Sequence, residues 1–339
     1  MRRILKSHWF PLMAGLIISI FILNRILIRY PSFSFSTTPK NLKQKENYWI
    51  APSLYTSPIA PGEDRNLLIY GEQLISKTSQ YLGPNGTVNK ISNGMNCQNC
   101  HLNSGTKPFG NNYGAVFANY PKYRERSGQI EDIYKRISDC FERSLNGKAP
   151  DSTSREMQAM ATYINWLGKN VPKGKKPDGV GIKNLSFLNR PADPLKGKQV
   201  YINNCKSCHG ENGEGKLNFD GLTYSFPPLW GNNSYNTGAG LFRLSRFAGF
   251  VKDNMPLSDN VNLQKKLTDE EAWDVAAFVN SQPRPSKDLS KDWPNISTKP
   301  IDHPFGPYAD SFTEAQHKYG PFAPIKKWKE AYSKSVVKK

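Results

Sequence analysis

Apolar residues recur every three or four positions in several stretches of the chain, which is the spacing of an amphipathic helix. One such stretch lies around residues 71–75 and another around residues 197–201. Two more follow later, at Met157, Met160, Ile164 and Leu167, and at Ala272, Val275, Ala276 and Val279. Thr268 with Glu271 predicts a capping box at the start of the last helix. The pattern predicts two helical halves of similar layout.

A further helical pattern runs from about residue 129 to residue 145. Its apolar positions form one stripe at 100° per residue: Ile130, Ile133, Ile137 and Phe141. Cys140 lies at the edge of this stripe, with Arg136 and Arg143 on the polar side and Ser144 close by. The thiol can therefore face a buried group while basic side chains flank it.

The two ends of the chain and its middle have other patterns. Arg2, Arg3 and Lys6 precede an apolar stretch, so residues 1–30 are predicted to be a signal peptide or an uncleaved signal anchor. This places the rest of the chain on the outer, periplasm-like side of the membrane. Residues 169–194 are rich in Lys, Pro and Gly and are predicted to be a linker. Residues 286–339 are predicted to be an extended basic tail wrapped on the surface, with His303 and His317 exposed.

Composition limits the class of protein. The 339 residues suffice for about two domains. The chain has 46 basic and 28 acidic side chains, a formal charge of +18, which favours anionic partners. No zinc-finger spacing or RNA-binding aromatic signature accompanies this charge, so nucleic acid is not an expected partner. A hydrophobic fraction of 37% excludes a protein with many membrane spans.

Four of the five cysteines lie in two copies of one motif. Cys97, Cys100 and His101 form the first C-x-x-C-H sequence, and Cys205, Cys208 and His209 form the second. In this motif two thioethers hold a haem and the adjoining histidine binds its iron. The sequence therefore predicts two covalently attached haem c groups. It also predicts an all-α fold of two cytochrome c-type domains, at residues 47–168 and 195–285.

Two other interpretations of the motifs are a structural zinc site and a thioredoxin-like redox pair. Zinc needs four ligands, so the two C-x-x-C units would have to meet in space. That arrangement leaves the histidine next to each unit unexplained. Haem attachment explains all six residues.

Each haem iron also needs a sixth ligand on the face of the haem opposite its histidine. In the second half Met255 lies between the motif and the last helix, where cytochromes c place a distal methionine; Lys252 is the fallback. Met95 is too close to its own motif, and Met157 and Met160 fit a helix core. The equivalent interval of the first half has neither methionine nor histidine, and Cys140 is its candidate. A buried, inert thiol is the alternative for Cys140.

The run from Cys140 to Ser144, followed by Asn146 and Gly147, resembles the distal-cysteine motif of the dihaem thiosulfate dehydrogenases, which are also described as tetrathionate reductases. The resemblance covers residues 47–285. It implies an active-site haem bound by His101 and Cys140, and an electron-transfer haem bound by His209 and Met255. It also implies substrate contacts from Arg126, Arg136 and Ser144. Some relatives have a lysine directly before the methionine, where this chain has Asn254.

The resemblance implies that two thiosulfate ions are joined to tetrathionate, or the reverse, with a small c-type cytochrome or another redox protein as electron partner. Arg143 and Lys148 are further cations that could line the anion site. A plain dihaem electron carrier is the rival interpretation, and it leaves Cys140 among arginines unexplained. A dihaem peroxidase is a third, and the sequence has no compelling distal histidine or glutamate set for it.

Overall fold

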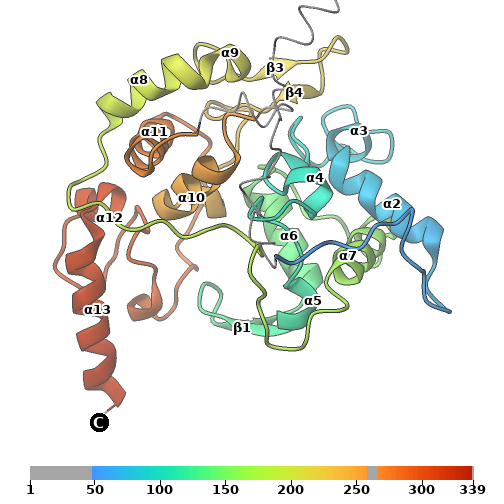
Figure 1. Ribbon diagram of the computed structural model, residues 1–339, viewed down its shortest axis with the longest axis horizontal. Helices are drawn as coiled ribbons and strands as arrows, with labels where there is room; N and C mark the ends of the chain where they lie inside the picture. Colours follow the sequence, from blue (N-terminus) through green and yellow to red (C-terminus); the bar gives the residue numbers. More distant parts are fainter. Residues whose placement is uncertain (1–47, 258–265, 338–339) are drawn as a thin grey trace, which may run out of the picture. The chain divides into compact units, whose positions relative to one another are not determined.

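The computed structural model describes residues 48–257 and 266–337, and all of these described residues belong to one compact unit (Figure 1). The predicted signal or anchor at residues 1–30 lies outside the described residues. Within the described ranges, no helix is both long and apolar enough to cross a membrane.

The first half of this unit is mostly helical. Its helices are α2 (Arg65–Ser76), α3 (Thr78–Leu82), η1 (Cys97–Asn99), α4 (Leu102–Gly105), α5 (Val116–Asn119), α6 (Ile133–Arg143) and α7 (Arg155–Leu167). The predicted helices around residues 71–75 and from Met157 to Leu167 are confirmed as α2 and α7. These two helices pack against each other.

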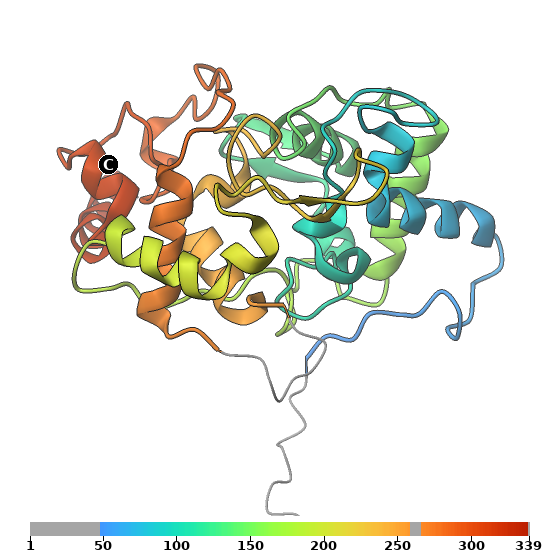
Figure 2. The same cartoon turned by 90° about the horizontal axis from the view of Figure 1, so that it is seen from above.

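The second half repeats this arrangement. Its helices are α8 (Pro194–Asn204), α9 (Lys206–His209), η2 (Gly240–Phe242), α10 (Leu244–Asn254) and α11 (Asp269–Ser281). Helix α8 packs against α11, as α2 does against α7. The predicted capping box of Thr268 and Glu271 is present at the start of α11. Figure 2 shows the blue-to-green elements of the first half beside the yellow-to-red elements of the second half and the C-terminal segment.

Close backbone contact explains why a glycine lies in the first helix of each pair. A Cβ atom at Gly71 of α2 would collide with the carbonyl oxygen of Ala159 in α7. A Cβ atom at Gly197 of α8 would collide with the carbonyl oxygen of Asp274 in α11. Each glycine therefore lets two helices cross at a distance that a side chain would prevent.

Two short hairpins depart from the predicted all-α fold. Strand β1 (Lys122–Arg124) pairs antiparallel with β2 (Gln129–Glu131), and β3 (Lys216–Leu217) pairs antiparallel with β4 (Tyr224–Phe226). The prediction of a helix from residue 129 is therefore wrong at its start: α6 begins at Ile133. Ile130, assigned to the buried stripe, is 75% exposed on β2.

The predicted extended tail is also wrong in part. The C-terminal segment begins as irregular chain but contains η3 (Ile296–Thr298), α12 (Glu314–Tyr319) and α13 (Phe322–Val337). Phe322 and Ile325 of α13 are buried in the core of the second half. The apolar residues that form this short interface are too widely spaced along the chain to reveal the helices from the sequence.

The linker region has no helix or strand before α8, but it is packed rather than free. Val180 and Ile182 are buried. The carbonyl groups of Gly179 and Gly181 accept hydrogen bonds from the backbone N–H groups of Phe109 (2.7 Å) and Asn111 (2.9 Å). This segment therefore supports a loop of the first half.

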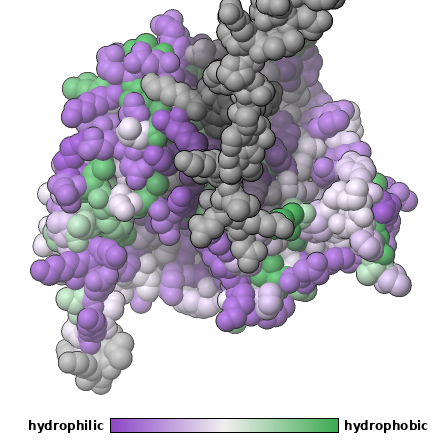
Figure 3. Space-filling view, in the orientation of Figure 1, coloured by the Kyte–Doolittle hydropathy of each residue, from purple (hydrophilic) through white to green (hydrophobic). Residues whose placement is uncertain are grey.

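The surface that Figure 3 shows is mainly hydrophilic, with small separate apolar areas. The large apolar side chains gather instead in two cores, one for each half. Each core takes side chains from the other half: Tyr235 and Phe242 enter the first core, and Leu102 enters the second. The two halves are therefore packed together.

Candidate active site

The first cavity lies between the first C-x-x-C-H motif and helices α6 and α7, and it has a volume of about 200 Å³. Its walls are mainly apolar, with Ile133, Ile137 and Phe141 from α6 and Met160 and Ile164 from α7. The chemically active residues on its wall are Cys97, Cys100, His101, Arg136, Cys140 and Ser144. The structure therefore brings together the predicted attachment motif, distal cysteine and two of the three predicted substrate contacts.

His101 is held in one orientation. Its Nδ1 lies 2.5 Å from the carbonyl oxygen of Asn111, which can only accept, so Nδ1 carries the proton. The ring of Tyr113 stacks on it, with 4.5 Å between the ring centroids. Burial lowers the pKa of His101 to about 4, so the imidazole is neutral. Its Nε2 lone pair is left for a metal, which is the usual arrangement of a histidine ligand.

The second cavity, of about 340 Å³, contains the second motif. Cys205, Cys208, His209 and Met255 all line it. His209 Nδ1 donates to the carbonyl of Pro227 at 2.9 Å, so its Nε2 is also free for a metal. Burial lowers the pKa of His209 below its usual value. In both cavities the histidine thus donates from Nδ1 to a backbone carbonyl and has Nε2 free.

These residues fit a haem in each cavity. Each cavity offers two thiols for thioether bonds and one neutral imidazole. Each also has on its wall the sulfur-bearing residue predicted as the sixth ligand, Cys140 in the first cavity and Met255 in the second, and apolar walls that suit a porphyrin. The ligand assignment itself stays a prediction.

Lys252 does not face the second cavity. Its Nζ donates to the carbonyl of Leu267 at 2.7 Å and pairs with Asp269 at 2.8 Å. Asn254 is fully buried, and its side-chain amide donates to the carbonyls of Phe109 and Phe250. Met255 is thus the sulfur donor that the second cavity receives from this loop.

Helix α6 positions Cys140. The side chain of Asp132 caps the helix by accepting a hydrogen bond from the backbone N–H of Lys135 at 2.8 Å. Ile137 and Phe141 anchor one face of the helix in the core. Arg136 lies one turn before Cys140 and therefore on the same face, as the sequence predicted.

The two predicted substrate arginines keep their charge without a carboxylate partner. Among the described residues, no ion pair involves Arg126 or Arg136. The charge of Cys140 is the main cause that raises the pKa of Arg136 above its usual value, burial opposes it, and the more distant carboxylates of Asp139 and Glu131 add to the rise. Burial is the main cause that lowers the pKa of Arg126 to about 10, and the charges of Arg136 and Arg143 act in the same direction. The site therefore has a local excess of positive charge.

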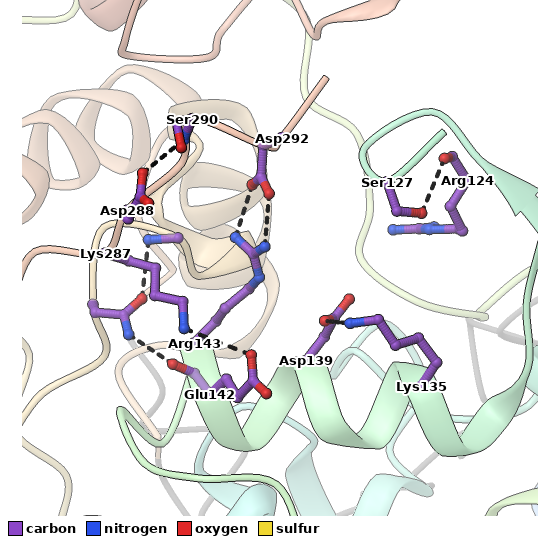
Figure 4. A network of polar contacts seen from close by, with 12 residues as sticks. Arg124, Ser127, Lys135, Asp139, Glu142, Arg143, Lys287, Asp288, Ser290 and Asp292 are labelled. Atoms are coloured by element: carbon purple, nitrogen blue, oxygen red, sulfur yellow. Dashed lines mark hydrogen bonds and ion pairs between the residues drawn. The ribbon is translucent and has the colours of Figure 1, made fainter. Parts of the chain in front are cut away.

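Arg143 and Lys148 do not join this pair. Figure 4 shows Arg143 bound through both terminal nitrogens to Asp292, at 2.8 Å each. Lys148 is exposed and is not part of the cavity wall. Arg126 is not on the cavity wall either, but it lies within electrostatic range of Arg136.

The predicted exposure of two histidines is wrong. His303 is 8% exposed and His317 is 2% exposed. Nδ1 of His317 donates to the carbonyl of Ile301 at 2.9 Å, and its Nε2 lies 3.0 Å from the carboxylate of Asp310. Burial lowers the pKa of His303 to about 4. Both belong to the packed C-terminal segment.

Sequence reasoning missed the residues that orient the proximal histidine. Asn111 has a positive φ of 59°, a conformation that asparagine adopts more readily than most residues. The consecutive Asn111 and Asn112 before Tyr113 were a signal for a tight turn here. Nothing in the sequence marked the carbonyl of Pro227 as the partner of His209.

Comparison with known proteins places both halves in sequence families. Residues 87–172 match the family described as SoxA/TsdA, cytochrome c domain, and residues 195–283 match the family described as cytochrome c. The thiosulfate dehydrogenase of Allochromatium vinosum is 42% identical over 199 residues, which cover 58% of this chain and 72% of the relative. That of Stutzerimonas stutzeri is 35% identical over 241 residues, which cover 71% and 74%.

Other similar proteins are matched over less of their length. The thiosulfate dehydrogenase of Psychrobacter arcticus is 40% identical over 208 residues, which cover 61% of this chain and 62% of that relative. The solved structure of the thiosulfate dehydrogenase TsdBA from Marichromatium purpuratum has a TM-score of 0.63 and 33% identity. The match covers 71% of this chain and 50% of that one.

The fold and the two cavities define a c-type cytochrome with two domains and two covalently bound haem c groups. Its identity with the Allochromatium and Stutzerimonas relatives extends over more than two thirds of their length. The chain belongs to the thiosulfate dehydrogenase family.

Proposed function

We propose that this chain interconverts thiosulfate and tetrathionate at the first cavity, with two electrons released for each pair of thiosulfate ions. The observation that carries the proposal is the position of Arg136 beside Cys140, with Arg126 nearby and with no carboxylate paired to either arginine in the described chain. The names of the relatives support thiosulfate as the substrate class.

Electrostatic repulsion is the main obstacle to this reaction. Two dianions with centres about 4 Å apart repel by about 16 kcal/mol at an effective dielectric constant near 20, four times the value for single charges. The guanidinium groups of Arg126 and Arg136 offset this repulsion, and their planar donors match sulfonate oxygens. The hydroxyl of Ser144, which is also on the cavity wall, can donate a further hydrogen bond.

Cys140 is proposed to have two roles: a ligand of the first haem iron and a nucleophile. In the second role its thiolate forms an S–S bond with the outer sulfur of one thiosulfate as two electrons leave, which gives an S-thiosulfonate. A second thiosulfate then attacks, through its own outer sulfur, the sulfur of the adduct that is bonded to Sγ of Cys140. The Sγ–S bond breaks, tetrathionate forms, and the Cys140 thiolate is regenerated. The positive charge of Arg136 lies beside Cys140 on the same cavity wall, where it attracts the anionic substrate.

When bound, the two haems supply acceptors for the two electrons, one each. We propose His101 and Cys140 as the iron ligands in the first cavity, and His209 and Met255 in the second. A thiolate lowers and a thioether raises a haem potential, so this ligand set favours electron flow toward the second cavity.

The partner and compartment follow from the same proposal. Electrons leave to, or arrive from, a small c-type cytochrome or another redox protein. The basic, apolar N-terminal pattern predicts a periplasmic protein, either released or tethered by an uncleaved anchor.

Replacing Cys140 by methionine tests the proposal. Cys140→Met should leave both haems attached, because the four motif cysteines are untouched, and it should lower thiosulfate-dependent haem reduction by about 100-fold or more. Covalent haem is measured by protein mass and reduction by the absorption bands. The control is Ser138→Ala on the same helix, which should reduce at the wild-type rate. Turnover near the wild-type rate in Cys140→Met would contradict the proposal.

A further inference from the structure

The ion pair between Arg143 and Asp292 joins the end of α6 to the C-terminal segment. Nη1 and Nη2 of Arg143 each donate to one carboxylate oxygen of Asp292 at 2.8 Å (Figure 4). Both side chains are only 11% exposed. Such a two-pronged contact uses both terminal nitrogens of the guanidinium group and neutralises its charge. Arg143 is therefore unavailable to a bound anion.

The segment that carries Asp292 follows the border of the candidate site. The backbone N–H of Trp293 donates to the carbonyl of Arg126 at 2.7 Å. Lys287 pairs with Glu142 of α6 at 3.6 Å. Lys287 and Trp293, the residues of the segment that form these contacts, lie beyond residue 283, where the match to the cytochrome c family ends. The segment thus contacts the Arg126 loop and the end of α6 at once.

Asp292 is also the counter-charge of the arginine cluster. Burial lowers the pKa of Arg126 most, the charges of Arg136 and Arg143 lower it further, and the charge of Asp292 opposes these two charges. With Arg143 neutralised, Arg126 and Arg136 remain, and their two positive charges match one thiosulfate dianion. A third free guanidinium would hold any dianion more tightly, whether it is substrate, product or an inert ion.

We propose that Asp292 is a positioning residue that acts through Arg143. It holds this third guanidinium away from the anion site, so that Arg126 and Arg136 alone bind the dianion and product can leave. The inference rests on the proposed function for its effect on turnover, whereas its effect on anion affinity does not depend on turnover.

Sulfate, an inert dianion, is the probe for this effect. Its affinity for the oxidised, haem-loaded protein is measured by titration calorimetry at low ionic strength. Asp292→Asn preserves the size of the side chain but frees the charge of Arg143, and sulfate affinity should rise by about tenfold. In turnover, KM for thiosulfate should fall and kcat should fall with it, because bound anions leave slowly.

Three further variants separate this effect from loss of structure. Asp288→Asn removes a carboxylate that is exposed on the same segment and accepts a hydrogen bond only from Ser290, so it should bind sulfate like the wild type. Asp292→Glu keeps the charge and should do the same. Combining Asp292→Asn with Arg143→Gln removes both charges, and sulfate affinity and kcat should return toward wild type.

The outcomes are distinct. Equal sulfate affinity in Asp292→Asn and Asp288→Asn would overturn the inference, as would a double variant in which the tighter binding persists. A wild-type protein that thiosulfate does not reduce would contradict the proposed function. The sulfate affinities would still test Asp292 in that case.

Discussion

Arg136 precedes Cys140 by four positions, so the two side chains share one face of α6 and one cavity. This spacing places the positive charge of Arg136 beside the sulfur of Cys140. The N–H donors of the Arg136 guanidinium group are then left for an anion. Ser144 follows Cys140 by four positions and lies on the wall of the same cavity. Two residues of α6 and its C-cap Ser144 thus supply a cation, a candidate nucleophile and a hydroxyl group to one cavity.

Arg136→Gln tests the role of the cation. Arg136 forms no ion pair within the described chain, so loss of its charge should raise KM for thiosulfate by about ten- to a hundredfold while both haems stay attached. Arg136→Lys should recover only part of this loss, since an ammonium group lacks the planar fork. Steady-state kinetics with an artificial electron acceptor measure both variants.

The matched control is Lys148→Gln, which removes the same charge from an exposed position off the cavity wall. Its KM should change less than about twofold. An equal rise of KM in Lys148→Gln and Arg136→Gln would mean that overall charge, rather than Arg136 itself, attracts the substrate.

The attachment residues were predictable because C-x-x-C-H is local in sequence. Cys140 was singled out because its interval has neither methionine nor histidine and because its motif resembles that of a known family. The partners that orient these residues were not predictable. Asn111 and Pro227 act through backbone carbonyls, which any residue carries. Asp292 meets Arg143 across 149 positions, a contact that one sequence without relatives cannot reveal.

At the scale of elements, periodicity identified α2, α7, α8 and α11 but missed the short elements and α13, whose 16 residues make it the longest helix of the described chain. Helices α2, α7 and α11 each bury a continuous apolar face, and this face is what the spacing predicts. Strand β2 and the start of α6 lie in one unbroken apolar pattern, so the sequence merged them. Asp132 marks the boundary between the two, because it follows β2 directly and its side chain caps the start of α6.

The helix crossings give a prediction at this scale. Gly71→Ala or Gly197→Ala should lower the free energy of unfolding by about 1–3 kcal/mol, because a new Cβ must displace a backbone carbonyl of the facing helix. Denaturant unfolding of the haem-loaded protein, followed by circular dichroism, measures the change.

Gly240→Ala is the control for the crossings, because no described atom lies within 4 Å of its added Cβ. It should leave the free energy of unfolding within about 0.5 kcal/mol of wild type. Unchanged stability in both Gly71→Ala and Gly197→Ala would show that the helices can separate without cost.

At the scale of the whole molecule, the C-terminal segment is part of the packed unit. Phe322 of α13 is 2% exposed and lies between Phe187 and Trp273, with ring centroids 5.6 and 5.7 Å away. Asp292 of the same segment binds the first half. The C-terminal segment therefore contacts both halves. The weak periodicity of its apolar residues gave no sign of these contacts in the sequence.

Phe322→Ala should lower the free energy of unfolding by about 3 kcal/mol, since it leaves a cavity against Trp273. Tyr332→Ala removes an aromatic ring that is 40% exposed on the same helix and should cost less than about 1 kcal/mol. Thermal unfolding of the haem-loaded variants compares them. Similar losses would mean that α13 is not anchored through Phe322.

The central claim is that the first cavity takes electrons from thiosulfate. The most direct measurement adds thiosulfate to the oxidised, haem-loaded protein, without any other reductant, and follows the haem absorption bands. The bands should change to those of the reduced haem, and tetrathionate should form, one ion for each two electrons. Bands that stay oxidised with thiosulfate, in a protein that a chemical reductant still reduces, would contradict it.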